Sequence, residues 1–313
     1  MAERFRAALH RAARDRRPLL LDAAMGTELA HRGADVSRPL WSARALLDAP
    51  ELVAAVHADD AAAGAEVLTA CTFRTHARNA AAAGAADPRA LARSLTERAV
   101  RLAREAADAA AARDGRERFV AGSQAPLEDC YSPDLVPGDD ALLREHAAHA
   151  ESLAAAGCDL ILIETMNTVR EAEAAARGAA AAGLPCVVSV VTDGAGRLLS
   201  GETLEDLARA LLALPLSPEA VGVNCIPARR VAGELERLAA AAPGVPLAAY
   251  GNTGRPAGEI GAYTDPIEPG EYAALVPAWI AAGAALVGGC CGTGPLHTRA
   301  VRGLLGGAAP PPR

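Results

Sequence analysis

The segment Asp159-Leu160-Ile161-Leu162-Ile163-Glu164 decides the fold, because its four central residues are all apolar. A strand with one solvated face would alternate apolar and polar residues, so this unbroken run predicts a strand buried on both faces. Strands of that kind belong to parallel sheets covered by helices. The segment therefore indicates an α/β fold.

Seven similar runs occur along the chain, and Ala-rich helical stretches separate them. This alternation is typical of repeated βα units, and a count of eight favours a single closed (β/α)8 barrel (a TIM barrel) over an open doubly wound sheet. In such barrels the active site lies at the C-terminal ends of the strands. The predicted strands are 18–22, 66–71, 119–123, 159–164, 186–191, 220–224, 246–250 and 284–288.

Helix signals support the same organisation. The stretch 203–214 places apolar residues on one face, and Pro215 stops it. Thr168 followed by Glu171 predicts a capping box after the fourth strand. We expect residues 1–305 to form one barrel domain and the proline-rich residues 306–313 to form a disordered tail.

Composition excludes several classes of protein. With 51% hydrophobic residues in 313, the chain can bury a large core, yet it has no apolar run of the roughly 18 to 20 residues that span a membrane. The start lacks the apolar core of a secretory signal, so we expect a cytoplasmic protein. Seven cysteines form a poor disulfide framework for such a chain, which favours metal binding or burial.

Charge patterning points to small-molecule rather than nucleic-acid chemistry. The formal net charge is −7, and the basic residues between Arg4 and Arg17 are interpreted as a solvated helix face rather than a nucleic-acid patch. Every basic residue is arginine, which excludes lysine Schiff bases and a P-loop. The sequence leaves the oligomeric state open and allows a homo-oligomer.

Three cysteines fall at one end of the predicted barrel. Cys225 follows the sixth strand, and Cys290 and Cys291 follow the eighth, where the sequence is rich in glycine. One strand separates the two positions, a distance of about 10 Å that side chains bound to one metal ion can bridge. Three thiolates with one open position are typical of a catalytic zinc site. The alternative is burial beside a tight turn, which is our interpretation of the other four cysteines, Cys71, Cys130, Cys158 and Cys186.

Two carboxylates end strands at the same rim. Asp22 follows the first strand and Glu164 ends the fourth, where a charge beside apolar residues is costly unless it serves a ligand. Each could instead be a helix cap or a solvated loop residue. The backbone N–H groups from Ala23 and Ala24 to Gly26 could bind a carboxylate of a ligand.

The histidines compete poorly as metal ligands. His146 and His149 share a helix face, and we expect both to face solvent because they precede the fourth strand. His297 closely follows the cysteine turn and could lie behind the metal ligands.

These features resemble the homocysteine S-methyltransferases over about residues 19–302. The most specific matches are the G-x-N-C that contains Asn224 and Cys225 and the G-G-C-C-G-T from Gly288 to Thr293. The resemblance implies that Zn2+ is held by the three cysteines, with the thiol of homocysteine in the open position. It also implies that the carboxylates Asp22 and Glu164 bind the amino group, and we place Ala23, Ala24 and Asn224 with them among the substrate-binding residues.

The expected methyl donor is a sulfonium, such as S-methylmethionine or S-adenosylmethionine. Its leaving group is a neutral thioether that needs no protonation, and its charge would be attracted by the thiolates and by the face of Trp41. Betaine and methylcobalamin come second. Arg74 stands where betaine-dependent relatives place a tyrosine, and we expect no additional module to carry a corrinoid. The segment 122–131 also follows the family's G-S-x-G-P-Y only loosely. Selenohomocysteine and selenocysteine remain alternative acceptors.

Two other classes of function stay open. The glycines at 288, 289, 292 and 294 could cradle a phosphate, since barrels often bind phosphate after the last strands. A metal sensor or store would need only the three thiolates, without a substrate cavity and without Asp22 or Glu164.

Overall fold

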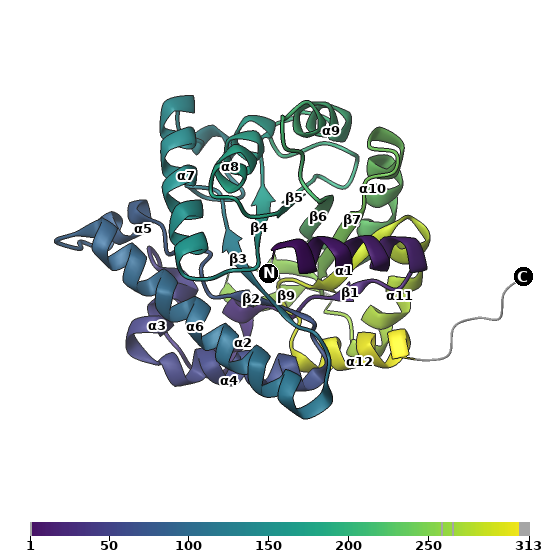
Figure 1. Cartoon of the computed structure of the whole chain (residues 1–313), viewed down its shortest axis with the longest axis horizontal. Helices are drawn as coiled ribbons and strands as arrows, with labels where there is room; N and C mark the ends of the chain where they lie inside the picture. Colours follow the sequence, from purple (N-terminus) through teal and green to yellow (C-terminus); the bar gives the residue numbers. More distant parts are fainter. Residues whose placement is uncertain (1, 258, 265, 307–313) are drawn as a thin grey trace, which may run out of the picture.

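A computed structural model describes residues 2–257, 259–264 and 266–306 of the chain. Eight parallel strands form one sheet, and helices surround it (Figure 1). A parallel bridge between Leu21 and Val67 joins the first strand to the second, so the sheet closes on itself. The predicted (β/α)8 barrel is confirmed.

The barrel strands begin and end within three residues of the predicted segments. They follow one another in chain order around the barrel, with β10 between β7 and β1. An antiparallel hairpin of β8 (Arg255–Ala257) and β9 (Glu259–Thr264) follows β7 and was not predicted. The barrel strands are β1 (Leu19–Leu20), β2 (Val67–Ala70), β3 (Phe119–Gln124), β4 (Leu160–Met166), β5 (Cys186–Val190), β6 (Ala220–Pro227), β7 (Leu247–Asn252) and β10 (Ala284–Gly289).

Helices form the outer layer. Their apolar faces pack on the outward side chains of the strands, and a second cluster of apolar residues fills the barrel interior. The α-helices are α1 (Ala2–Asp15), α2 (Met25–His31), α3 (Ala45–Asp48), α4 (Pro50–Ala63), α5 (Ala77–Ala82), α6 (Pro88–Asp114), α7 (Asp139–Ala155), α8 (Val169–Ala181), α9 (Leu204–Leu212), α10 (Ala228–Ala241), α11 (Pro269–Ala281) and α12 (Pro295–Gly306); the short 3-10 helices are η1 (Trp41–Arg44) and η2 (Pro133–Leu135).

The two helices singled out in the sequence both begin at a threonine cap. Thr203 caps α9 in a complete capping box with Asp206. Thr168 caps α8 by accepting a hydrogen bond from the Glu171 N–H, as predicted. The Glu171 carboxylate is used elsewhere, because it accepts a hydrogen bond from Leu127 N–H at 2.8 Å. The cap by Thr168 is therefore confirmed, whereas the Glu171 side chain binds the loop that contains Leu127.

Helix α1 covers the N-terminal ends of the strands, and Figure 1 shows it lying across the barrel. Its apolar face inserts Phe5 and Leu9, both fully buried, into the interior cluster, where Phe5 meets Phe119 edge to face at 5.5 Å between ring centroids. Its basic face stays largely exposed, as predicted, and Arg6 pairs with Glu219 just before β6. This end of the barrel is therefore closed, and any ligand site lies at the opposite rim.

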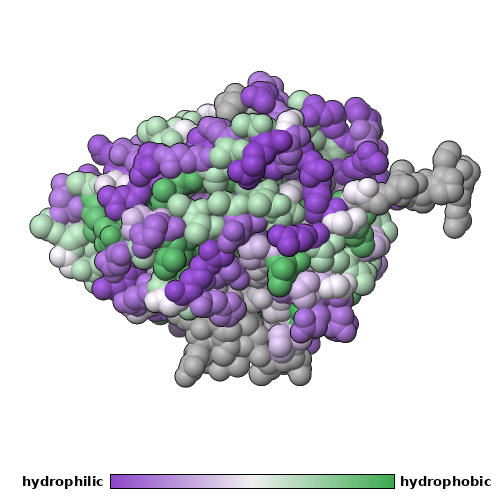
Figure 2. All heavy atoms as spheres, turned by 90° about the horizontal axis from the view of Figure 1, so that it is seen from below, coloured by the Kyte–Doolittle hydropathy of each residue, from purple (hydrophilic) through white to green (hydrophobic). Residues whose placement is uncertain are grey.

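In the face drawn in Figure 2, hydrophilic residues predominate, and hydrophobic residues form small separate patches. Within the described residues, none of the helices combines the length and apolar character that crossing a bilayer requires. The predicted tail lies outside the described residues except for Gly306, which is the last residue of α12.

Candidate active site

The three predicted metal ligands converge at the C-terminal rim of the barrel. Asn224 of β6 and Gly288 of β10 both pair with Tyr250 of β7, so the residues that follow them lie at the same height. The sulfur atoms of Cys225, Cys290 and Cys291 all lie within 4.8 Å of one another. Tetrahedral bonds of about 2.3 Å to zinc place sulfurs roughly 3.7 Å apart. The three sulfurs therefore suit one thiolate-bound metal ion.

The local backbone explains how adjacent cysteines can share one ion. Gly289 contacts Thr293 so closely that an added Cβ would lie 2.2 Å from its hydroxyl oxygen, and that hydroxyl donates to the Cys290 carbonyl at 2.7 Å. Gly292 has a φ of 82°, which permits the sharp turn after Cys291. On the other strand, Cys225 itself has a left-handed φ of 56°.

The same turn uses its own N–H groups. Gly292 N–H donates to the Thr27 hydroxyl at 3.1 Å, and Gly294 N–H donates to His297 Nδ1 at 3.2 Å. A phosphate cradle needs free backbone donors, so these bonds argue against that alternative. His297 also contacts the ring of Tyr272 and braces the turn from outside.

The sulfur cluster favours a thiolate at Cys225. Hydrogen bonds from Cys290, Cys291 and Tyr131 hold the pKa of Cys225 well below its usual range, while the same cluster raises the pKa of Cys290. The Tyr131 hydroxyl lies 3.0 Å from the Cys225 sulfur. Proximity to the negative sulfur raises the pKa of Tyr131, so its phenol is a hydrogen-bond donor.

Asn224 supports the site from behind. Its side chain is fully buried, its Oδ1 accepts from Thr165 N–H at 2.8 Å, and its Nδ2 donates to the Thr165 hydroxyl at 2.8 Å. Nδ2 also lies 4.0 Å from the Cys290 sulfur. Thr165 has a left-handed φ of 61° beside Glu164. The amide thus links the backbone next to Glu164 with the cysteine cluster.

The two predicted carboxylates are buried at the same rim. Asp22 is 4% exposed and accepts two hydrogen bonds from Thr69, whereas Glu164 is 9% exposed and accepts one from the Ser123 hydroxyl. Burial raises the pKa of each to about 7. Both carboxyls are therefore poised to gain a positively charged partner.

A third buried carboxyl lies beneath the turn that follows Asp22. Asp60 of α4 is 1% exposed, accepts a hydrogen bond from the Thr298 hydroxyl at 2.8 Å, and also interacts with the N–H of Ala23. Burial raises its pKa well above the usual range. The N–H of Ala23 is thus directed at Asp60, which leaves the donors of Ala24 to Gly26 for a ligand.

The three cysteines, Asp22 and Glu164 line one cavity of about 780 Å³, large enough for two small molecules, whereas Asp60 and Asn224 are not in its lining. The cavity is also lined by Phe73 with its two neighbours Trp41 and Arg74. Cys71 and Cys130 also line it, but burial raises the pKa of both thiols to about 12, so they remain protonated as expected for structural cysteines.

The prediction for His146 and His149 was wrong. Both are buried, because α7 packs on α8 and on the barrel through the face that carries them. His146 Nε2 lies 3.2 Å from Glu171 Oε1, and Gln124 Nε2 donates to the His146 carbonyl at 2.9 Å. His149 Nε2 lies 3.2 Å from the Thr75 hydroxyl.

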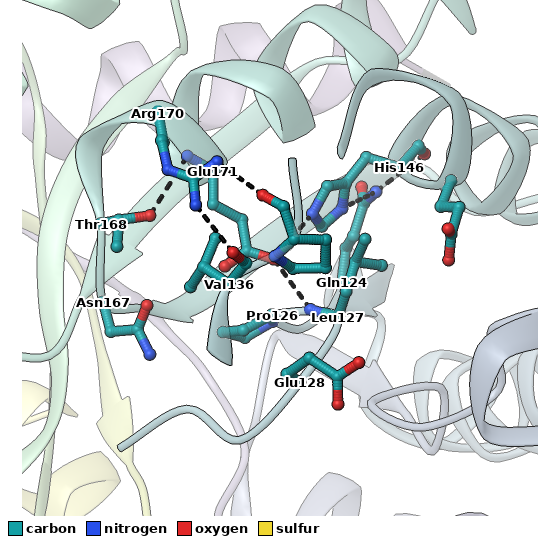
Figure 3. Close-up of polar contacts among 12 residues, drawn as sticks. Gln124, Pro126, Leu127, Glu128, Val136, His146, Asn167, Thr168, Arg170 and Glu171 are labelled. Atoms are coloured by element: carbon teal, nitrogen blue, oxygen red, sulfur yellow. Dashed lines mark hydrogen bonds and ion pairs between the residues drawn. The ribbon is translucent and has the colours of Figure 1, made fainter. Parts of the chain in front are cut away.

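The His146 network holds the loop 125–131, which forms one wall of the cavity. Figure 3 shows Gln124, His146 and Glu171 joined behind this loop, with Leu127 N–H directed at the Glu171 carboxylate. Arg170 fixes the next segment by donating to the Val136 carbonyl at 2.8 Å. His146 therefore positions this wall, whereas His149 contacts Thr75 in the loop after β2.

Comparison with known proteins identifies the family. Residues 19–305 match the family model described as homocysteine S-methyltransferase. The chain belongs to the homocysteine S-methyltransferase family. A homocysteine S-methyltransferase of Escherichia coli (strain K12) is 33% identical over 302 residues, which cover 91% of this chain and 94% of that protein. This chain is accordingly a methyltransferase.

Two further comparisons bear on the chemistry of this family member. The crystal structure of the homocysteine methyltransferase MmuM from Escherichia coli in its metallated form has a TM-score of 0.80 at 32% identity, covering 92% of this chain and 96% of that one. A selenocysteine Se-methyltransferase of Brassica oleracea var. italica is 28% identical over 91% of this chain and 88% of its own.

The sequence did not predict several residues of this candidate site. Tyr131 beside Cys225 and Ser123 beside Glu164 both come from β3 and its loop, within the segment noted only for its loose match to the family. Thr69 lies inside β2. A polar residue within an apolar barrel strand is the signal that would have marked Thr69 and Ser123, whereas Tyr131 lies seven residues beyond the end of β3 and carries no such signal.

Proposed function

We propose that this chain is a zinc-dependent S-methyltransferase that moves a methyl group from a sulfonium donor, S-methylmethionine or S-adenosylmethionine, to the thiol of homocysteine, giving methionine. The observation that carries the proposal is the meeting of three cysteine sulfurs and two buried carboxylates in one cavity. A metal store would need the sulfurs alone, whereas an amino-acid thiol needs both groups.

Zinc is the metal that the donor set fits best. Thiolate ligands select soft or borderline metals, and three of them leave a fourth position for a substrate. Bound by Cys225, Cys290 and Cys291, zinc would supply a Lewis acid that keeps an incoming thiol deprotonated near neutral pH.

The acceptor's other groups meet residues of the chain itself. Asp22 and Glu164 would bind the ammonium group of homocysteine, and the turn from Ala23 to Gly26 would bind its carboxylate through the donors of Ala24 to Gly26. Asn224 would act by holding Thr165 and Cys225 in their left-handed conformations. These contacts fix the thiol sulfur at the metal and aim it at the open part of the cavity.

The methyl transfer needs no general acid from the protein. The homocysteine sulfur forms a bond to the methyl carbon, the S–CH3 bond of the sulfonium breaks, and its electron pair stays with the leaving thioether. The thiol proton goes to solvent. Trp41 lines the cavity and offers a ring face to the sulfonium cation before transfer.

The test is a matrix of donors and acceptors on zinc-loaded protein, read by mass spectrometry. We expect methionine from homocysteine with a sulfonium donor. Methionine formed from betaine and from neither sulfonium would contradict the donor. Because a selenocysteine methyltransferase is among the relatives, selenocysteine and selenohomocysteine are also tested as acceptors. Methylation of a selenol but not of homocysteine would contradict the proposed acceptor. Zinc binding without any turnover would favour a metal store.

The remaining expectations concern the setting. We propose a cytoplasmic enzyme whose partners are a small-molecule thiol and a methyl donor, with no nucleic acid and no membrane. A homo-oligomer is compatible with this function, and none of the roles given to the residues above requires one.

A further inference from the structure

Arg74 is a buried cation without a carboxylate partner. It follows β2, is 8% exposed and lines the cavity. Its Nη1 donates to the Pro126 carbonyl at 2.8 Å, and its guanidinium carbon lies 5.0 Å from the centre of the Phe73 ring. Among the described residues, no carboxylate oxygen lies within 4.0 Å of its nitrogens. A guanidinium has five N–H groups, and the bond to Pro126 uses one.

The neighbouring acids cannot serve Arg74 without giving up other partners. Asp129 pairs with Arg38, and Glu128 pairs with Arg78 at 2.7 Å. Burial lowers the pKa of Arg74, as expected for a cation that has lost water without gaining a full counter-ion. Holding such a charge in the wall of a cavity is costly unless a ligand supplies the anion.

The position of Arg74 is fixed in advance. Pro126 belongs to the loop 125–131, and the network of Gln124, His146 and Glu171 anchors this loop from behind (Figure 3). On the other side, Phe73 packs edge to face on Trp41, with ring centroids 5.2 Å apart. A preorganised guanidinium loses little conformational freedom when it binds a planar anion.

The acceptor does not supply the anion that would pair with Arg74. Under the proposed function, on which this inference rests, the homocysteine ammonium meets Asp22 and Glu164, and its carboxylate meets the turn after β1. Arg74 lies after β2, on the side of the cavity that carries Trp41. We propose that Arg74 binds a carboxylate of the methyl donor, so that the enzyme selects a sulfonium that carries a carboxylate, such as an amino-acid sulfonium, over one that lacks it.

The test combines one change in the protein with one change in the donor. S-methylmethionine and its carboxamide, S-methylmethioninamide, are compared with wild type and Arg74→Met, using zinc-loaded protein and homocysteine as acceptor. We expect Arg74→Met to lower kcat/KM for S-methylmethionine by about 10- to 100-fold, the usual range for a lost charge-assisted hydrogen bond. With S-methylmethioninamide as donor, Arg74→Met should lower kcat/KM by less than threefold. The KM for homocysteine should stay unchanged. Arg74→Lys should recover part of the loss with the carboxylate donor.

A matched control addresses a merely structural role. Arg98 also donates to a backbone carbonyl, that of Leu46 at 2.6 Å, and is not among the residues that line the cavity. Arg98→Met should leave the preference for the carboxylate donor intact. An equal loss with both donors in Arg74→Met would overturn the inference and leave the proposed function standing. Failure of the wild-type enzyme to use either sulfonium would overturn both.

Discussion

Thr69 holds Asp22 by two hydrogen bonds across the closure of the barrel. The backbone N–H of Thr69 donates to Asp22 Oδ2 at 2.6 Å, and its hydroxyl donates to Oδ1 at 2.7 Å. Thr69→Val removes the hydroxyl alone, so the pKa of Asp22 should rise further and the KM for homocysteine should increase by about tenfold at pH 7. Thr69→Ser keeps the donor and should stay near wild type. Equal kinetics for the Val and Ser variants would show that this bond does not tune Asp22.

Amino-acid affinity should depend on pH near neutrality. Because the folded pKa of Asp22 and Glu164 is about 7, the carboxylates that attract an ammonium group are partly protonated at pH 6 and ionised at pH 8. Affinity should therefore rise as the pH increases through 7, and binding should release protons. Norleucine is the probe for calorimetry, since it has no thiol to ionise. Asp22→Asn and Glu164→Gln should weaken binding and flatten the profile; wild-type profiles in both would assign these residues a structural role.

Zinc content should depend on the three cysteines, whereas the fold should not depend on zinc. Wild-type protein should bind about one zinc, and the Cys290→Ala, Cys291→Ala double variant should bind none and lose activity. The sulfurs lie at the rim of the barrel, and Cys290 only borders the interior apolar cluster, so circular dichroism and the melting temperature should change little. Full zinc occupancy in the double variant would contradict the assigned site.

Asn224 should increase the affinity for zinc without being a zinc ligand. Asn224→Ala removes both bonds to Thr165 and leaves buried groups without partners, so zinc affinity should fall by about 10- to 100-fold, as for other residues behind metal ligands. Competition with a chromophoric chelator measures this loss. Unchanged affinity would mean that Cys225 keeps its position without the amide.

Strand packing makes Gly222 irreplaceable in β6. An added Cβ would lie 2.1 Å from the Ala248 carbonyl oxygen, which belongs to the neighbouring strand and cannot move aside. Gly222→Ala should lower the free energy of unfolding by at least about 2 kcal/mol. Gly233 in α10 has open space around it, and Gly233→Ala should instead stabilise by about 0.5 to 1 kcal/mol. Chemical denaturation of both variants measures the contrast.

The sequence predicted the barrel well because its strands are short apolar runs, such as 160–163, whose burial is a property of the run itself. The meeting of the three cysteines could be predicted from the strand ends, since parallel strands bring their carboxyl ends to one rim. The surroundings of Arg74 and Tyr131 could not be predicted, because they depend on how the loop 125–131 is anchored by α7 and α8. The error for His146 has the same origin: spacing alone does not say which face of a helix meets its neighbours.

Helix α1 has a kinetic consequence. Since it closes one end of the barrel, both substrates must enter and both products must leave through the same opening. The sulfurs and Asp22 line the same cavity as Trp41 and Arg74. Donor and acceptor would then have to be held there together, so initial rates measured over both substrates should give intersecting double-reciprocal lines, as a ternary complex requires.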